Sequence, residues 1–160
     1  MGFTLIELLI VVTILGFLAA MVIANLHQMW SAGRAEAMAT TVQQVRQLIE
    51  FKAAARQGPL AQIGYPAAID ADWFQSPDLP YHTWTNRPII IETVTAAGNE
   101  IYPAVKTFDS ESPDSTDAWY NDANGAFCVR VPAGCSDART LEMFNLANVT
   151  CVTSLDQTRP

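Results

Sequence analysis

The sequence predicts an α+β protein in which a long N-terminal helix packs on a small antiparallel β-sheet. Residues 3–23 form an apolar run in which Glu7 is the only charged residue. Apolar residues then recur every three or four positions until a Gly-Pro pair at 58–59, as on one face of a helix that ends there. An Asn-Gly pair at 124–125 separates two strand-like segments, which is typical of a β-hairpin.

The apolar run is long enough to span a membrane. Residues 8–24 carry no charge, and residues 3–6 extend them to the length of a spanning helix. No Lys or Arg precedes the run, which argues against a cleaved secretory signal. A carboxylate inside such a helix costs roughly 2.5–3.5 kcal/mol on insertion scales. Glu7 therefore needs a partner or a function, unless it lies near the lipid headgroups.

The first residues carry a motif that points to a family. The sequence Gly-Phe-Thr-Leu-Ile-Glu-Leu at 2–8 resembles the class III signal of type IV pilins and type II secretion pseudopilins. The resemblance implies cleavage by prepilin peptidase between Gly2 and Phe3, and methylation of the new Phe3 amine. It also implies that Glu7 pairs with a Phe3 amine, its own or that of a neighbouring subunit, and so sets the stagger of subunits during assembly.

The chain departs from the family pattern in two places. Family leaders usually contain Lys or Arg before the glycine, whereas only Met1 and Gly2 precede the cut here, and the sequence leaves open whether the true start lies upstream of Met1. Many members have a proline where this chain has Ala24, which weakens the case for a kink there. Gly16 is present, and it is expected to be a point of helix flexibility, because glycine costs roughly 1 kcal/mol in a helix interior.

The amphipathic continuation and the head complete four predicted segments. These are a remnant leader at 1–2, a transmembrane or filament-core helix at 3–26, an amphipathic stem helix at 27–57 and a globular β-sheet head at 58–160. The stem has one apolar stripe, formed by Met38, Val42, Val45, Leu48, Ile49 and Ala53.

Within the head, several short elements are expected. Residues 87–94 read as a strand, residues 102–108 as a weaker one, and residues 70–74 as a short helical turn. The hairpin at 118–131 also resembles the Trp-x-Tyr-Asn…Gly-x-Phe pattern near the end of several pilin heads. A final strand is expected near 148–153.

Composition excludes some functions. The 160-residue chain has a formal net charge of −7, with a net +2 over residues 31–57 and a net −8 from residue 58 onward. This balance argues against nucleic-acid binding, which needs a basic surface.

Neither histidine, His27 or His82, accompanies a nucleophile motif, and no phosphate-binding glycine loop is present. We therefore expect no enzyme activity, and we expect both histidines to be surface or interface residues.

Calcium is the best candidate for a bound metal. Major pseudopilins can hold calcium in a loop of the head, and the acidic loop and hairpin turn here supply hard oxygen ligands. Turns are also rich in Asp and Asn for backbone reasons alone, and that is the simpler interpretation. The candidate ligands are Asp114, Asp117, Asp122 and Asn124, with Asp109 and Glu111 nearby.

Three cysteines lie in the second half of the head. Outside the cytoplasm we expect one disulfide and one remaining thiol. The sequence does not choose among the three pairings of Cys128, Cys135 and Cys151, although we slightly favour Cys128 with Cys151.

These features predict a structural subunit of a type IV pilus-like filament, most specifically a type II secretion pseudopilin. The resemblance implies a single-pass inner-membrane precursor with its head outside the cytoplasm, and a filament at the periplasm or cell surface afterwards. The implied partners are other copies, related pilin-like subunits, prepilin peptidase, an assembly platform and a motor ATPase. The alternatives are a surface pilus subunit for adhesion, motility or DNA uptake, and a membrane-anchored binding domain that never polymerises.

Overall fold

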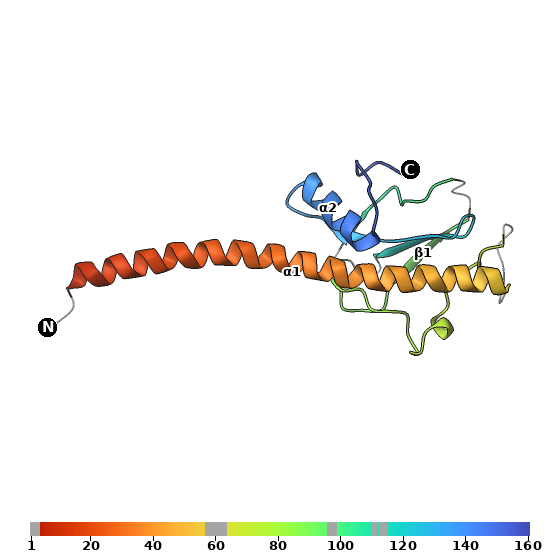
Figure 1. Cartoon of the computed structure of the whole chain (residues 1–160), viewed down its shortest axis with the longest axis horizontal. Coiled ribbons are helices and arrows are strands. Elements are labelled where there is room, and N and C mark those ends of the chain that lie inside the picture. Colours follow the sequence, from red (N-terminus) through yellow and green to blue (C-terminus); the bar gives the residue numbers. More distant parts are fainter. Residues whose placement is uncertain (1–3, 57–63, 96–98, 110–111, 113–114) are drawn as a thin grey trace. The chain divides into compact units, whose positions relative to one another are not determined.

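The computed structural model describes residues 4–56, 64–95, 99–109, 112 and 115–160, and the side chains of residues 23–28 are outside that description. The chain divides into two compact units, Met1–Gly33 and Arg34–Pro160. The long helix α1 (Leu5–Ala55) begins in the first unit and ends in the second (Figure 1). The predicted division of this helix into a transmembrane or filament-core part at 3–26 and a stem part at 27–57 stays a prediction.

The first unit contains the apolar half of α1. Its stretch Leu5–Val22 is long and apolar enough to cross a membrane, and none of it is buried within the protein. Such a surface needs lipid or other apolar helices around it, because exposed apolar area of this size is unfavourable in water.

In the second unit, α1 buries one stripe of side chains. Met38, Val42, Val45 and Ile49 are buried in the core, as the spacing of three and four predicted. Leu48 and Ala53 of the predicted stripe are half-buried, and Ala35 one turn earlier is buried as well. The helix ends at Ala55, and Arg56 follows with a left-handed φ of 49°. The Gly-Pro pair predicted to end the helix lies outside the described residues.

The sheet of the head is mixed. Strands β1 (Ile91–Val94), β3 (Ala118–Asn121) and β4 (Ala126–Val129) lie in the order β1-β3-β4. β3 and β4 are antiparallel, but β1 and β3 are parallel. A second pair, β2 (Thr107–Phe108) and β5 (Val131–Pro132), is also parallel.

The predicted α+β class with a small sheet is therefore confirmed. The prediction that all strands of this sheet are antiparallel is wrong, because β1 and β3 are parallel. The connection from residue 95 to 117 carries the chain back to the starting edge of β1 before β3 begins. A connection of that length permits parallel pairing, which a tight turn does not.

The predicted hairpin forms around a four-residue loop at 122–125. Gly125 has a φ of 74°, and its amide donates to the carbonyl of Asn121 over 2.8 Å. The side-chain oxygen of Asn124 accepts from the amide of Ala126 at 2.9 Å. The Asn-Gly pair thus directs the chain back as predicted, with the glycine in the conformation that other residues avoid.

The C-terminal region differs from the prediction. Helix α2 (Asp137–Asn148) follows an N-cap at Ser136, whose hydroxyl accepts from the amide of Arg139. The strand expected near 148–153 is wrong, because Asn148 is the last residue of α2 and residues 149–153 are not extended into a ladder. A short 3₁₀ helix, η1 (Ala71–Trp73), confirms the predicted turn at 70–74.

Candidate assembly site

The first turn of α1 contains a capping box. Thr4 is the residue before the helix and Glu7 is its third residue. The amide and the hydroxyl of Thr4 donate to Oε2 of Glu7 over 2.9 Å and 2.8 Å, and the amide of Glu7 faces the Thr4 hydroxyl at 3.4 Å. Each side chain thereby satisfies backbone groups that the helix start leaves unpaired.

This geometry gives Glu7 polar partners inside its own chain. A carboxylate is favoured at the N-terminus of a helix, where the peptide dipoles carry partial positive charge. Hydrogen bonds also strengthen in surroundings of low polarity. Thr4 was not predicted as a partner of Glu7, although the spacing Thr-x-x-Glu is the sequence signature of a capping box.

The other residues predicted to act in processing or assembly are Gly2, Phe3 and Gly16. Gly2 and Phe3 lie outside the described residues. Gly16 lies within α1, and a Cβ added there would meet none of the described atoms within 4 Å. Its flexibility stays a prediction. The hydroxyl of Thr13 donates to the carbonyl of Ile10 over 2.8 Å, so the apolar stretch tolerates this polar group.

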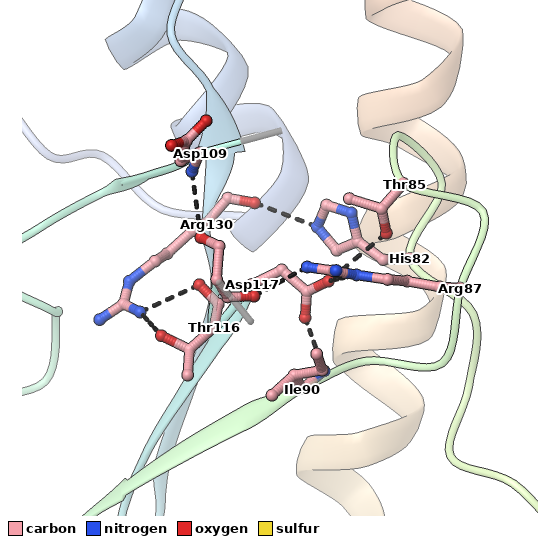
Figure 2. Close-up of polar contacts among 9 residues, drawn as sticks. His82, Thr85, Arg87, Ile90, Asp109, Thr116, Asp117 and Arg130 are labelled. Carbon is pink, nitrogen blue, oxygen red and sulfur yellow. Dashed lines mark hydrogen bonds and ion pairs between the residues drawn. The ribbon is translucent and has the colours of Figure 1, made fainter. Parts of the chain in front are cut away.

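The head has a separate buried polar cluster around Asp117 (Figure 2). Asp117 is fully buried just before β3. Its Oδ1 accepts from the amide of Ile90 at 2.7 Å, and its Oδ2 accepts from the Thr85 hydroxyl at 3.4 Å and faces Nε of Arg87 at 3.5 Å. A buried carboxylate with these partners holds the loop at 85–90 against the start of β3.

His82 belongs to the same cluster and is fully buried, so the expectation of a surface or interface histidine is wrong for this residue. Nε2 lies 3.1 Å from the carbonyl of Arg130. A carbonyl can only accept, so Nε2 carries a proton and donates it to this oxygen. The ring also makes an edge contact with Phe108, with centroids 5.0 Å apart. Burial lowers the pKa of His82, although the charge of Asp117 opposes this.

The guanidinium of Arg130 completes the cluster. It donates to the carbonyls of Val105 and Thr116 over 3.0 Å and 3.1 Å, and it forms an ion pair with Glu92. These contacts connect Arg130 to three other segments of the head, two of them through backbone carbonyls. The cluster therefore serves folding, and it does not resemble an arrangement of nucleophile and base.

The calcium candidates do not converge on one point. Asp117 and Asp122 flank β3 at opposite ends, roughly 16 Å apart along an extended strand. Asp114 lies outside the described residues. Asn124 uses its amide to donate to the carbonyl of Glu100 at 2.8 Å.

Among the candidate ligands that the structure describes, Asp122 alone retains a feature that favours a cation. It is buried, and its Oδ1 has no hydrogen-bond partner among the described residues. In that part of the chain, no three His, Cys, Asp or Glu side chains come together as a metal site. Calcium binding stays an untested expectation.

The cysteines are free thiols in the structure. Cys128 is buried in β4, and burial raises its pKa to about 11. Cys135 and Cys151 are exposed. A Cys128–Cys151 pairing in an oxidising compartment stays a prediction.

Arg46 and Lys106 are further cations that are buried or half-buried in the head and that were not predicted to be. Arg46, expected on a polar face of the stem, donates to the carbonyls of Phe127 and Asn148. Lys106 is buried, and its ammonium donates to three carbonyls, those of Pro103, Leu155 and Gln157. Their partners are distant carbonyls, which leave no signal in the local sequence.

Comparison with known proteins bears on the N-terminus. The family described as the prokaryotic N-terminal methylation motif matches residues 2–23. The chain carries a prepilin-type N-terminus. This match supports a type IV pilin-like subunit that prepilin peptidase processes, and it covers the apolar half of α1 but not the head. No curated protein and no solved structure matches the chain.

Proposed function

We propose that this protein is a structural subunit of a type IV pilus-like filament, and most specifically a pseudopilin of a type II secretion-like system. The observation that carries the proposal is the methylation motif at residues 2–23, which coincides with the apolar half of α1. An unburied apolar helix attached to a polar head suits two successive environments. It lies in lipid before assembly and among the helices of other subunits afterwards.

The proposed chemistry at the N-terminus concerns the ammonium of Phe3 and the carboxylate of Glu7. Cleavage after Gly2 creates an ammonium on Phe3, and methylation preserves its positive charge. In the monomer, Thr4 holds the Glu7 carboxylate through two hydrogen bonds. In the filament, Glu7 accepts a Phe3 amine, which fixes the register between copies because a charge in an apolar core is tolerated only when it is paired.

The proposed partners follow from this role. Other copies and related pilin-like subunits form the polymer, and prepilin peptidase processes the precursor. An inner-membrane platform and a motor ATPase drive extraction from the bilayer. The head lies outside the cytoplasm throughout.

The experiment is mass spectrometry of the N-terminal peptide, after expression of the full chain in bacterial membranes with and without prepilin peptidase. The proposal predicts a peptide that begins with methylated Phe3 when the peptidase is present, and one that retains Gly2 when it is absent. The matched control is Gly2→Asp, which we expect to remain unprocessed. Retention of Gly2 by the unaltered chain in the presence of active peptidase would contradict the proposal.

A second measurement separates secretion from a surface pilus. A pseudopilin is required for export of a secreted enzyme, so deletion should leave that enzyme in the periplasm. Normal export together with loss of surface filaments would favour a pilus subunit instead.

A further inference from the structure

The exposed apolar surface of α1 continues beyond the stretch that could span a membrane. That stretch ends at Val22, whereas Met29 and Trp30 are still 68% and 66% exposed. Tryptophan is seldom left so exposed, because its ring is large and mostly apolar. The first Lys, Arg, Asp or Glu after Glu7 is Arg34, where the second unit begins. In a membrane-held chain, the bilayer surface should therefore cross the helix between Val22 and Arg34.

The distance between Glu7 and Trp30 matches the thickness of a bilayer. Both residues lie in the first unit and on one continuous helix. The helix rises about 35 Å between them, at about 1.5 Å per residue. The hydrocarbon core of a bilayer is about 30 Å thick, and the bilayer with its headgroup layers is about 40–45 Å thick. One bilayer can therefore hold Glu7 in one headgroup layer and Trp30 in the other.

A different depth of the helix fits these two residues less well. If the bilayer were centred on Leu5–Val22, Glu7 would lie about 10 Å from the midplane, inside the hydrocarbon, where a carboxylate is costly. Trp30 would lie about 25 Å from the midplane, where its exposed ring faces water. Moving the helix so that both residues reach headgroup layers removes both costs at once.

The chemistry of the residues around Trp30 suits a headgroup layer. Indole combines an apolar ring with an N–H donor, so tryptophan concentrates where acyl chains meet water. Met29 beside it adds a flexible apolar side chain. The polar residues Asn25, His27 and Gln28 fall within about 8 Å of Trp30 along the helix, near the same layer.

We propose that Trp30, with Met29, binds the headgroup layer of the bilayer and fixes the depth of α1. This inference rests on the membrane stage of the proposed function. It extends the lipid-contacting part of the helix from the predicted end at residue 26 to residue 30. At this depth Glu7 lies in the opposite headgroup layer, where Thr4 holds its carboxylate before assembly.

The test uses the full chain in vesicles of phosphatidylethanolamine and phosphatidylglycerol, in which part of the lipid carries bromine atoms that quench tryptophan fluorescence. The bromines lie either near the headgroups or near the ends of the acyl chains. The chain has four tryptophans, so the emission of Trp30 is the difference between the unaltered chain and Trp30→Phe. We expect the shallow bromines to reduce this emission at least about twofold more than the deep bromines.

Trp73→Phe is the matched control, because Trp73 belongs to the second unit. This variant should keep the stronger quenching by shallow bromines, whereas Trp30→Phe should lose it. Trp30 is exposed, so its replacement by phenylalanine should leave the head folded.

Two results would overturn the proposal. One is stronger quenching of Trp30 by the deep bromines than by the shallow ones. The other is a Trp30 emission that neither brominated lipid reduces and that iodide in the water quenches. Flotation of the vesicles separates this inference from the proposed function. A chain that floats with the vesicles while lipid leaves Trp30 unquenched contradicts this inference alone, and a chain that does not float contradicts both.

Discussion

Single polar residues in the apolar half of α1 are matched to partners one helical turn away. Thr4 and Glu7 satisfy each other at the helix start, and the Thr13 hydroxyl returns to the carbonyl of Ile10. Thr4 therefore gives the Glu7 carboxylate a position that does not depend on a second subunit. Under the proposed function, assembly would exchange these hydrogen bonds for an ion pair with a Phe3 amine.

Replacement of Glu7 tests that exchange. We expect Glu7→Val to be processed and membrane-held but to assemble poorly, because the Phe3 amine then lacks a partner in the filament core. Leaving one member of a buried ion pair unpaired costs roughly 3–5 kcal/mol, so the filament yield should fall at least about tenfold. The measurement is the ratio of sheared filament to membrane-bound protein on immunoblots.

Glu7→Gln is the matched variant for this experiment. Glutamine retains an oxygen that can accept from Thr4 but carries no charge, so it should assemble about as poorly as valine. Normal filament yield from either variant would refute the role given to Glu7.

Gly125 is a second single residue on which local structure depends, here the loop of the β3–β4 hairpin. Its φ of 74° is unfavourable for other residues, and an added Cβ would lie 2.4 Å from the Tyr65 ring. We expect Gly125→Ala to lower the free energy of unfolding by roughly 1–3 kcal/mol, measured by denaturant titration of the full chain in micelles. Gly33→Ala is the control, because a Cβ there meets no atom within 4 Å, and it should not destabilise. Equal stability of the Gly125 variant and the unaltered chain would contradict this account.

Three elements of the head meet at Arg46. Its Nε and Nη2 donate to the carbonyl of Phe127 in β4 over 3.0 Å and 2.8 Å, and its Nη1 donates to the carbonyl of Asn148, the last residue of α2, over 2.9 Å. Asn148 in turn bonds to the amide and carbonyl of Val129. These bonds connect the stem part of α1, the hairpin and α2 through one guanidinium.

Loss of the Arg46 guanidinium should lower the stability of the head. We expect Arg46→Met to lower the free energy of unfolding by roughly 2–4 kcal/mol, because partly buried carbonyls lose charged donors. Hydrogen exchange should rise in β4 and at the end of α2. Arg34→Met removes an exposed arginine from the same helix and should change stability by less than about 0.5 kcal/mol. Similar exchange rates in the two variants would argue against the role of Arg46.

The molecule as a whole combines an apolar anchor with a head whose interior contains several polar groups. Among the described residues, His82, Lys106, Asp117 and Arg130 are all buried in the head. Burial lowers the pKa of His82 and that of Lys106, so folding depends on pH wherever the folded and unfolded states bind different numbers of protons.

Acid should destabilise the head through His82. Burial lowers its pKa in the folded state, despite the charge of Asp117, while the unfolded chain keeps a value near 6.5. The unfolded state then binds more protons, so the stabilising contribution is present above pH of about 6.5 and is lost as pH falls below it. The loss should approach at most about 1.4 kcal/mol per pH unit.

The control for this pH experiment is a variant that removes the titration of His82 but leaves its neighbours in place. Asp117 and Arg87 are the charged neighbours, and Trp84 and Phe108 are the aromatic ones. His82→Gln keeps a donor for the carbonyl of Arg130 but cannot titrate. Denaturation between pH 7 and pH 5 should therefore show a shallower pH dependence in this variant, and an unchanged slope would exclude His82 as the source.

Much of this architecture could be predicted from the sequence because the responsible interactions are local. The spacing of Met38, Val42 and Val45 identifies a helix face whatever it packs against, and Gly125 specifies a turn through its own backbone freedom. The prepilin-type motif is likewise contiguous. The Thr4–Glu7 capping box was equally local and could have been found from its spacing.

Other features were decided only when distant segments met. The parallel pairing of β1 with β3 depends on where the connection from 95 to 117 returns the chain. The burial of His82, Arg46 and Lys106 depends on backbone carbonyls far along the sequence. The apolar helix, its Glu7 and the amphipathic stripe follow from composition and periodicity, which are properties of neighbouring residues. Which polar side chains are buried depends on the folded chain, because folding supplies the partners that make burial tolerable.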